Sequence, residues 1–176
     1  QEETANRTSE LEERIRLNSL LGRINRRLHH CQFLPTEDQE ELSLQTLQTR
    51  LTQAIESFKD SDLATAGPQL ESIAAELETF THTLFSTNEA RFIATRDRWN
   101  SLFPVIGAPD LHFIAKPDAM AEESRNLFEY DQIDSAISRL RRGTEIYQAW
   151  WEEVTTLRQR SADSWAAAGN KFEGLG

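Results

Sequence analysis

The chain of 176 residues contains a single cysteine, Cys31. One cysteine cannot form an internal disulfide, so cysteine usage leaves the compartment open between cytoplasm and periplasm. No apolar run approaches the roughly 20 residues that span a bilayer, and no charged-then-apolar signal peptide opens the chain. We therefore expect a soluble segment without membrane insertion.

Glycine is scarce outside the ends and turns, and no segment shows the sustained alternation of apolar and polar residues that is typical of a strand. These two absences predict an all-α fold. Phosphate-cradling glycine loops are absent as well. His82 and His112 are isolated, with no Ser, Cys or acid motif nearby that indicates a catalytic triad. We expect no catalytic activity and no cofactor in this chain.

The run His29-His30-Cys31 is the obvious candidate for a metal site. Consecutive residues on a helix point about 100° apart, so at most part of this trio could face one ion. No second ligand pair with zinc-like spacing follows it. We expect no metal, and we interpret Cys31 as a small apolar residue of a helix seam.

The formal net charge of -10 argues against nucleic-acid binding, which needs clustered Lys and Arg. The charge is unevenly placed, because residues 14–36 carry no acid whereas residues 37–62 are strongly acidic. The arginines of the first segment are Arg14, Arg16, Arg23, Arg26 and Arg27. Three interpretations stay open, in this order: docking on the acidic second helix, binding an acidic partner or lipid headgroups, and contacting nucleic acid.

Residues 8–31 have the pattern of one long amphipathic helix. Ser9 and Glu12 have the spacing of a capping box, and apolar residues follow at steps of four and three. This seam consists of Leu17, Leu21, Ile24, Leu28 and Cys31. It covers barely two heptads, so packing within the domain is favoured over pairing with a second copy as a short coiled coil.

Prolines and turn residues divide the rest of the chain. A second helix is expected from Thr36 to about Lys59, and a third from about Leu63, with Pro68 either kinking it or marking its start. After Phe103, prolines enforce a non-helical connection of about a dozen residues, too apolar for a solvated loop. We interpret it as a clamp across the helices or as a lip over a groove. Two more helices are expected over 118–129 and 132–168.

Residues 58–84 resemble residues 128–154 at an offset of seventy. The apolar positions that match are Phe58/Phe128, Leu63/Ile133, Ala66/Ala136, Leu70/Leu140, Leu77/Tyr147, Phe80/Trp150 and Leu84/Val154. From the second pair onward, their steps place them on one stripe of a helix. This internal similarity, together with the absence of strand patterns, predicts one all-α domain of about six or seven helices over residues 1–176. After the helix 8–31, two related helical-hairpin units, at about 37–103 and 107–170, form a bundle or a short array.

The turn and second helix of each unit resemble a tetratricopeptide-like hairpin. The residues that carry the resemblance are 126–136, NLFEYDQIDSA, followed by Leu140 and Tyr147, and 58–66, FKDSDLATA, followed by Leu70. The order of Arg98-Trp99, the Pro-rich connection and the second hairpin is also similar to helical regions that accompany formylglycine-generating-enzyme-like or kinase domains in multidomain bacterial proteins. That resemblance implies an accessory role, with the chemistry done elsewhere.

Stacked helix pairs leave a concave or grooved face that binds peptides or partner helices. We therefore expect a non-catalytic protein-interaction or scaffold module with a protein or peptide partner. The residues expected to contact the partner are Trp151, Phe113, Arg139, Arg141 and Arg142.

Two other hypotheses stay open. The chain could be a regulatory or accessory part of an enzyme, with a pocket between the two halves, which would require buried acids that face an enclosed cavity. It could also be an assembly element in which residues 1–31 form a homodimer. In each case the start at Gln1 and the end in Gly174-Leu175-Gly176 are interpreted as those of a segment cut from a longer protein.

Overall fold

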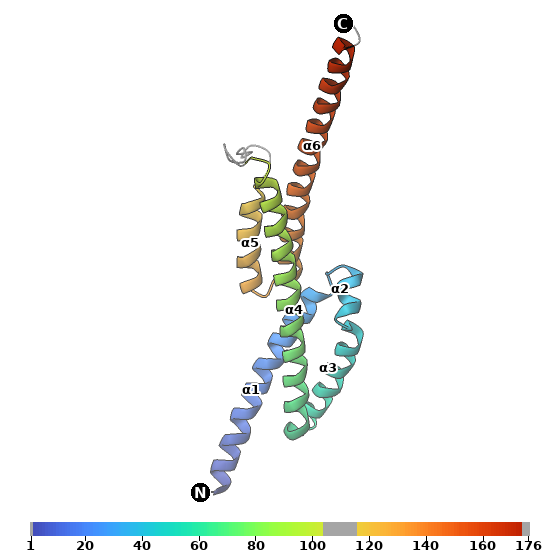
Figure 1. The fold of residues 1–176 in the computed structure, drawn as a ribbon. Helices are drawn as coiled ribbons and strands as arrows, with labels where there is room; N and C mark the ends of the chain where they lie inside the picture. The colour runs from blue at the N-terminus through green and yellow to red at the C-terminus, as the bar shows by residue number, and fades with distance from the viewer. Residues whose placement is uncertain (1, 104–115, 174–176) are drawn as a thin grey trace. The chain divides into compact units, whose positions relative to one another are not determined.

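The computed structural model describes residues 2–103 and 116–173, with the side chains of residues 7–103 and 116–166. Within these ranges the chain forms helices and no strand (Figure 1). The helices are α1 (Glu2–Cys31), α2 (Thr36–Glu41), α3 (Leu44–Lys59), α4 (Leu63–Asn100), α5 (Pro117–Glu129) and α6 (Ile133–Glu173). The predicted all-α fold is confirmed. A search of the described helices finds none with the length and apolar character that a membrane span requires.

The chain divides into two compact units. Unit 1 consists of residues 1–87 and 124–137, and unit 2 consists of residues 88–123 and 138–176. Helices α4, α5 and α6 therefore contribute residues to both units. The predicted halves, 37–103 and 107–170, are defined by the sequence echo rather than by contacts, and they remain a prediction.

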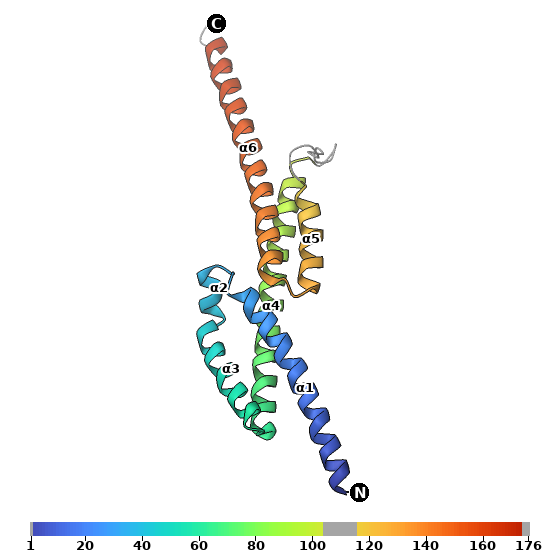
Figure 2. The same cartoon turned by 180° about the vertical axis from the view of Figure 1, so that it is seen from behind.

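The core of unit 1 lies among α1, α3 and the first part of α4, which run side by side (Figures 1 and 2). Side chains that are at most 1% exposed come from all three helices: Leu17, Ile24, Cys31, Leu47, Ala54, Leu70, Ile73 and Leu77. Apolar surface removed from water stabilises the fold by about 25 cal/mol per Å². The predicted seam of the N-terminal helix is thus buried inside unit 1, with Leu21 partly exposed. Packing within the chain, rather than a coiled coil through this seam, is what the structure shows.

Two predicted helix boundaries were wrong. The N-terminal helix begins at Glu2 rather than at about Thr8. The expected continuous helix from Thr36 to Lys59 is broken after α2, where Ser43 adopts a left-handed φ of 54°. Leu42 and Leu44 on either side of Ser43 are both buried. Residues two apart on a continuous helix point about 200° apart, so the break allows both leucines to face the core.

Helix α4 begins at Leu63 and includes Pro68. The Asp62 side chain accepts a hydrogen bond from the amide of Thr65 at 3.1 Å, as an N-cap residue does. Pro68 lies in the second turn, where it has no amide hydrogen to offer the carbonyl of Ala64. Because Ala64 is exposed, water can bind that carbonyl instead. The proline therefore neither begins the helix nor ends it.

Two turns between helices, seventy residues apart, have the same backbone hydrogen bonds. In each turn, an amide donates to the carbonyl five residues earlier: Asp62 to Ser57 and Gln132 to Leu127, both at 2.9 Å. The residue before the donor is left-handed in each: Ser61 with φ 66° and Asp131 with φ 59°. This is the pattern of a Schellman helix end, which turns the chain sharply into the next helix. The equivalence between the two stretches therefore extends from side-chain type to backbone conformation.

Unit 2 is built on aromatic packing between α4 and α6. The Tyr147 ring lies with its centre 5.6 Å from that of Phe92 and also 5.6 Å from that of Trp150. Trp99, which is 3% exposed, contacts Trp150 at the same distance. The Tyr147 hydroxyl donates to an Asp118 oxygen at 2.9 Å, so this buried phenol keeps a hydrogen-bond partner.

Gly143 allows helices to approach closely in this core. A Cβ atom there would lie 2.8 Å from the Phe92 ring and 3.3 Å from the Pro117 carbonyl oxygen. Phe92 is only 1% exposed, so its ring has little room to move. By contrast, a Cβ atom at Gly22 of α1 would meet nothing within 4 Å.

The two glycines therefore make a matched test. We expect Gly22→Ala to raise the free energy of unfolding by about 1 kcal/mol, because alanine favours helix and the site is open. We expect Gly143→Ala to lower it by about 1–3 kcal/mol, because the added methyl group overpacks the Phe92 contact. Urea unfolding followed by circular dichroism measures both. A Gly143→Ala protein as stable as wild type would contradict the close approach.

Candidate functional site

The residues predicted to contact a partner lie in unit 2, except that Phe113 falls outside the described residues. Trp151 is half-buried, with the Arg98 guanidinium 3.4 Å from the centre of its ring. Arg141 Nε donates to Asn88 Oδ1 at 3.1 Å. One face of Trp151 is thus covered by a cation–π contact.

Arg139 and Arg142 are more accessible. Arg139 forms an ion pair with Glu123 at 3.3 Å, and Arg142 one with Glu145 at 3.1 Å. Arg142 and Trp151 are nine residues apart, which places them about 180° apart around α6. The predicted set therefore does not form a single face of the helix, and its role in partner binding remains a prediction.

The candidate metal residues have other roles. His30 Nδ1 lies 2.8 Å from Asp134 Oδ1, and Cys31 is fully buried. In the part of the chain that the structure describes, no group of three or more His, Cys, Asp or Glu side chains could hold a metal ion.

Burial raises the pKa of the Cys31 thiol from about 9 to about 12, while the charge of Arg27 opposes the rise and that of Asp134 adds to it. Because the pKa is higher in the folded state, the thiol stabilises the fold fully below about pH 9, and this contribution is lost as pH rises toward 12. We expect the stability advantage of wild type over Cys31→Ala to shrink by roughly 1 kcal/mol between about pH 8 and pH 10. Urea unfolding at each pH measures it. A difference that is constant with pH would contradict this prediction.

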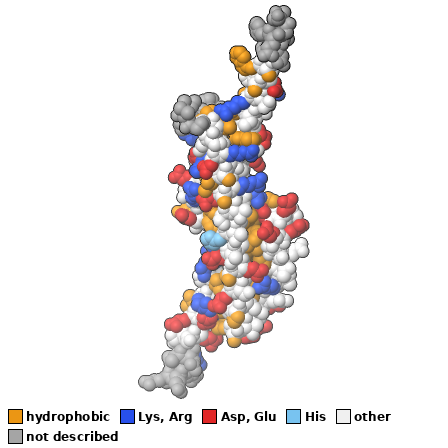
Figure 3. Space-filling model, in the orientation of Figure 1, with side chains coloured by type: hydrophobic (Ala, Val, Ile, Leu, Met, Phe, Trp, Pro, Cys, Tyr) orange, Lys and Arg blue, Asp and Glu red, His pale blue; other side chains and the backbone are white. Residues whose placement is uncertain are grey.

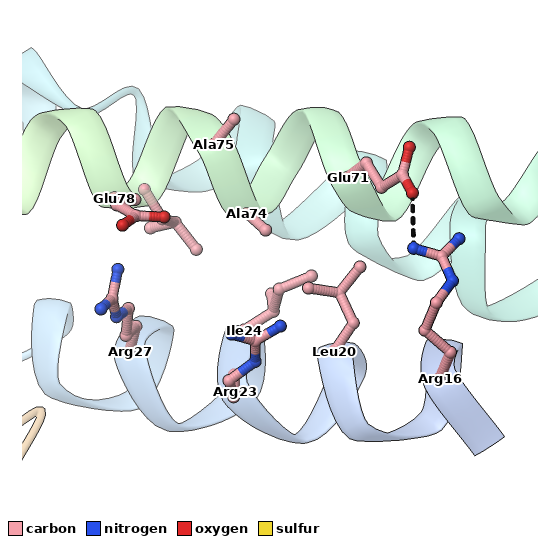
Figure 4. A pocket seen from close by; sticks show the side chains of 10 residues that line it. Arg16, Leu20, Arg23, Ile24, Arg27, Glu71, Ala74, Ala75 and Glu78 are labelled. Carbon is pink, nitrogen blue, oxygen red and sulfur yellow. Dashed lines mark hydrogen bonds and ion pairs between the residues drawn. The ribbon is translucent and has the colours of Figure 1, made fainter.

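Unit 1 contains a half-open groove of about 340 Å³ between α1 and α4 (Figure 4). Apolar residues of both helices line its floor: Leu20 and Ile24 from α1, and Ala74 and Leu77 from α4. Ala74 points toward α1, and its small side chain leaves space between the two helices (Figure 4). The volume is at the lower end of the range for ligand pockets, about 300–1,000 Å³.

The two rims of the groove carry opposite charges. Arg16, Arg23 and Arg27 lie along α1, while Glu71 and Glu78 lie along α4 (Figure 4). On the face of the whole chain seen in Figure 3, acidic and basic side chains are intermixed. In the groove, by contrast, the basic side chains are on α1 and the acidic side chains are on α4.

Ion pairs occupy the two ends of the α1 rim. At one end, Arg16 bonds to Glu71 at 2.7 Å across the groove. The hydrogen bonds that Arg16 donates to Glu13 and Glu71 raise the pKa of its guanidinium above the usual value. Toward the other end, Arg27 Nε bonds to Asp131 at 2.8 Å.

Two other charges of the groove are not used in this way: Arg23, between Arg16 and Arg27 on α1, and Glu78, which lies across from Arg27 (Figure 4). Among the described residues, neither Arg23 nor Glu78 has an ion-pair partner. One cation and one anion therefore face the groove from opposite rims and are available to a ligand.

Sequence reasoning identified the basic run of α1 but assigned its partners to the wrong segment. The expected docking on the acidic helix after residue 36 was wrong, because Arg16 pairs with Glu71 of α4 and Arg27 with Asp131 before α6. One sequence pattern could have indicated the rims of the groove: Arg16 and Arg23 are seven residues apart, and so are Glu71 and Glu78. Residues seven apart on a helix share a face, so each pair can line one rim.

Comparisons of the chain with protein-family models, curated proteins and solved structures found no match. The resemblance to tetratricopeptide-like hairpins therefore stays a prediction from the residues that carry it. The function is argued below from the groove itself.

Proposed function

We propose that this chain is a non-catalytic protein-interaction module, and that the α1–α4 groove of unit 1 holds a peptide segment of a partner protein. The observation that carries the proposal is that Arg23 and Glu78 lie on opposite rims of an apolar floor, and that neither has an ion-pair partner among the described residues. Buried apolar anchors with charged groups around them are the usual arrangement of a peptide site.

The opposite signs of the rims favour a polypeptide over a small ion. An anion that approaches Arg23 also approaches the carboxylates of α4, and a cation at Glu78 meets the arginines of α1. A peptide can carry an acidic and a basic side chain at once and satisfy both. The volume of about 340 Å³ suits an apolar anchor side chain rather than a whole helix.

The carboxylates of the groove favour binding over acid–base chemistry. The Glu71 side chain is 52% exposed and is already paired with Arg16. A general acid or base needs a shifted pKa, which burial supplies and exposure does not. The matching turns at Ser57–Asp62 and Leu127–Gln132 support the further proposal that the two hairpins are related tetratricopeptide-like units.

The groove can be tested by filling it. Ala75 is exposed and lines the groove, so Ala75→Trp should block the site without disturbing the core. We expect peptides selected from a displayed random library for binding to wild type to bind Ala75→Trp at least about tenfold more weakly. Fluorescence anisotropy with the selected peptides measures the affinity.

A control variant tests for unspecific effects of a new tryptophan. Thr83→Trp places the same side chain on an exposed position of α4 outside the groove, and should bind as wild type does. Circular dichroism checks that both variants are folded. Selected peptides that bind Ala75→Trp as tightly as wild type, or a selection that yields no binder, would contradict the proposal.

A further inference from the structure

One ion pair crosses the α1–α4 groove of unit 1. Arg16 is on the α1 rim and Glu71 is on the α4 rim, and Arg16 Nη1 donates to Glu71 Oε1 at 2.7 Å (Figure 4). The pair lies at one end of the groove, because Arg16 is the first lining residue of α1 and Glu71 is the first lining residue of α4. A peptide that lies in the groove and continues past this end therefore meets the ion pair.

Glu13 fixes the guanidinium of Arg16 in this position. Arg16 donates from Nε to Glu13 Oε2 at 2.8 Å and from Nη2 to Glu13 Oε1 at 2.6 Å. A guanidinium is planar, so two hydrogen bonds to one carboxylate set its direction. The remaining nitrogen, Nη1, is the one that bonds to Glu71. The contact across the groove is therefore held by three side chains rather than by two.

The seam between the two helices continues beyond this ion pair. Gly67 of α4 is buried and lies four residues before Glu71. A Cβ atom on Gly67 would lie 3.7 Å from Glu13 Oε1 and 3.8 Å from a methyl carbon of Leu17. The Glu13 side chain therefore covers the seam at the point where Gly67 faces Leu17. Without this cover the groove is longer by about one helical turn, or about 5.4 Å.

The ion pair across the groove can open without loss of the fold. The side chains of Arg16 and Glu71 are 51% and 52% exposed, and ion pairs with this exposure contribute little to stability because water screens them. When the pair is broken, water solvates the Glu71 carboxylate, and Glu13 still neutralises the Arg16 guanidinium. No buried charge is left without a partner.

We propose that the Arg16–Glu71 ion pair is a latch that closes one end of the groove, and that a bound peptide has to open it. This inference rests on the proposed function, since the latch has a role only if the groove holds a peptide. Only molecules with an open latch accept the peptide along its full length, so the apparent affinity is reduced in proportion to the open fraction. The latch therefore lowers the affinity of the groove below the value that its walls alone would give.

Two substitutions of opposite charge open the latch. Arg16→Gln removes a cation and Glu71→Gln removes an anion, and either one abolishes the ion pair. The probes are the peptides selected from the displayed random library for binding to wild type. We expect them to bind each variant about two- to fivefold more tightly in fluorescence anisotropy, which is the range that an exposed ion pair supplies. A general effect of charge on the peptides would instead have opposite signs in the two variants.

A second ion pair of unit 1 supplies the matched control. Arg50 of α3 bonds to Glu76 of α4 at 2.6 Å, and the two side chains are 37% and 45% exposed. Like the latch, this pair joins two helices of unit 1, but neither of its residues lines the groove. Arg50→Gln and Glu76→Gln should therefore leave the affinity for the peptides unchanged. Circular dichroism checks that all four variants are folded.

The outcomes separate the latch from the groove. An affinity that is unchanged or lower in Arg16→Gln or in Glu71→Gln would overturn the latch, and so would an equal rise in the two control variants. If Ala75→Trp still weakens the same peptides in that case, the groove proposal stands and only the latch fails. Peptides that bind Ala75→Trp as tightly as wild type contradict the groove itself, and the latch with it.

Discussion

Unit 1 depends on the burial of one face of α1 against α3 and α4. Leu17, Ile24 and Cys31 of α1 are at most 1% exposed, and they lie in the same core as Leu47 and Leu70. Full burial of a large aliphatic side chain is worth about 1.5–3 kcal/mol, whereas an isolated helix has little stability in water. At its C-terminal end, α1 is fixed by Arg27–Asp131 and His30–Asp134, both at 2.8 Å. Hydrophobic burial holds the helix, and these polar contacts set its register.

The proposed peptide groove exists because α1 is docked in this way. Docking places Arg16, Arg23 and Arg27 of α1 opposite Glu71 and Glu78 of α4. The ion pair that crosses the groove, Arg16–Glu71, is about half exposed on both sides. Exposed pairs contribute about 0–1 kcal/mol, so a ligand can displace this one at small cost. The groove can therefore open without weakening the core.

The sequence was informative where a feature depends on local spacing. The steps of three and four in α1 and α4 predicted which side chains are buried, and the echo at seventy residues extends to the turns at Ser61 and Asp131. Local spacing could not predict the break at Ser43, because nothing in the residues of that segment forbids helix. The break follows from the need to bury Leu42 and Leu44 together, which is a tertiary requirement.

The groove was unpredictable for a related reason. Arg16 and Glu71 are 55 residues apart in sequence, and only the packing of α1 beside α4 brings them together. Helical spacing could place residues on a face, but it could not say which faces meet. The sequence pointed to the arginines of α1 as a charged cluster, and some of them line the groove. It could not indicate that Arg98 covers the ring of Trp151, which was predicted to contact a partner.

The docking of α1 is tested most directly by hydrogen exchange resolved along the chain. If α1 is held by the core of unit 1, the amides of residues 17–31 exchange as slowly as those of residues 66–84 in α4, because both are exposed only when the unit opens. Exchange of residues 17–31 at the rate of an isolated helix, while residues 66–84 stay protected, would show that α1 is undocked and would contradict the α1–α4 groove.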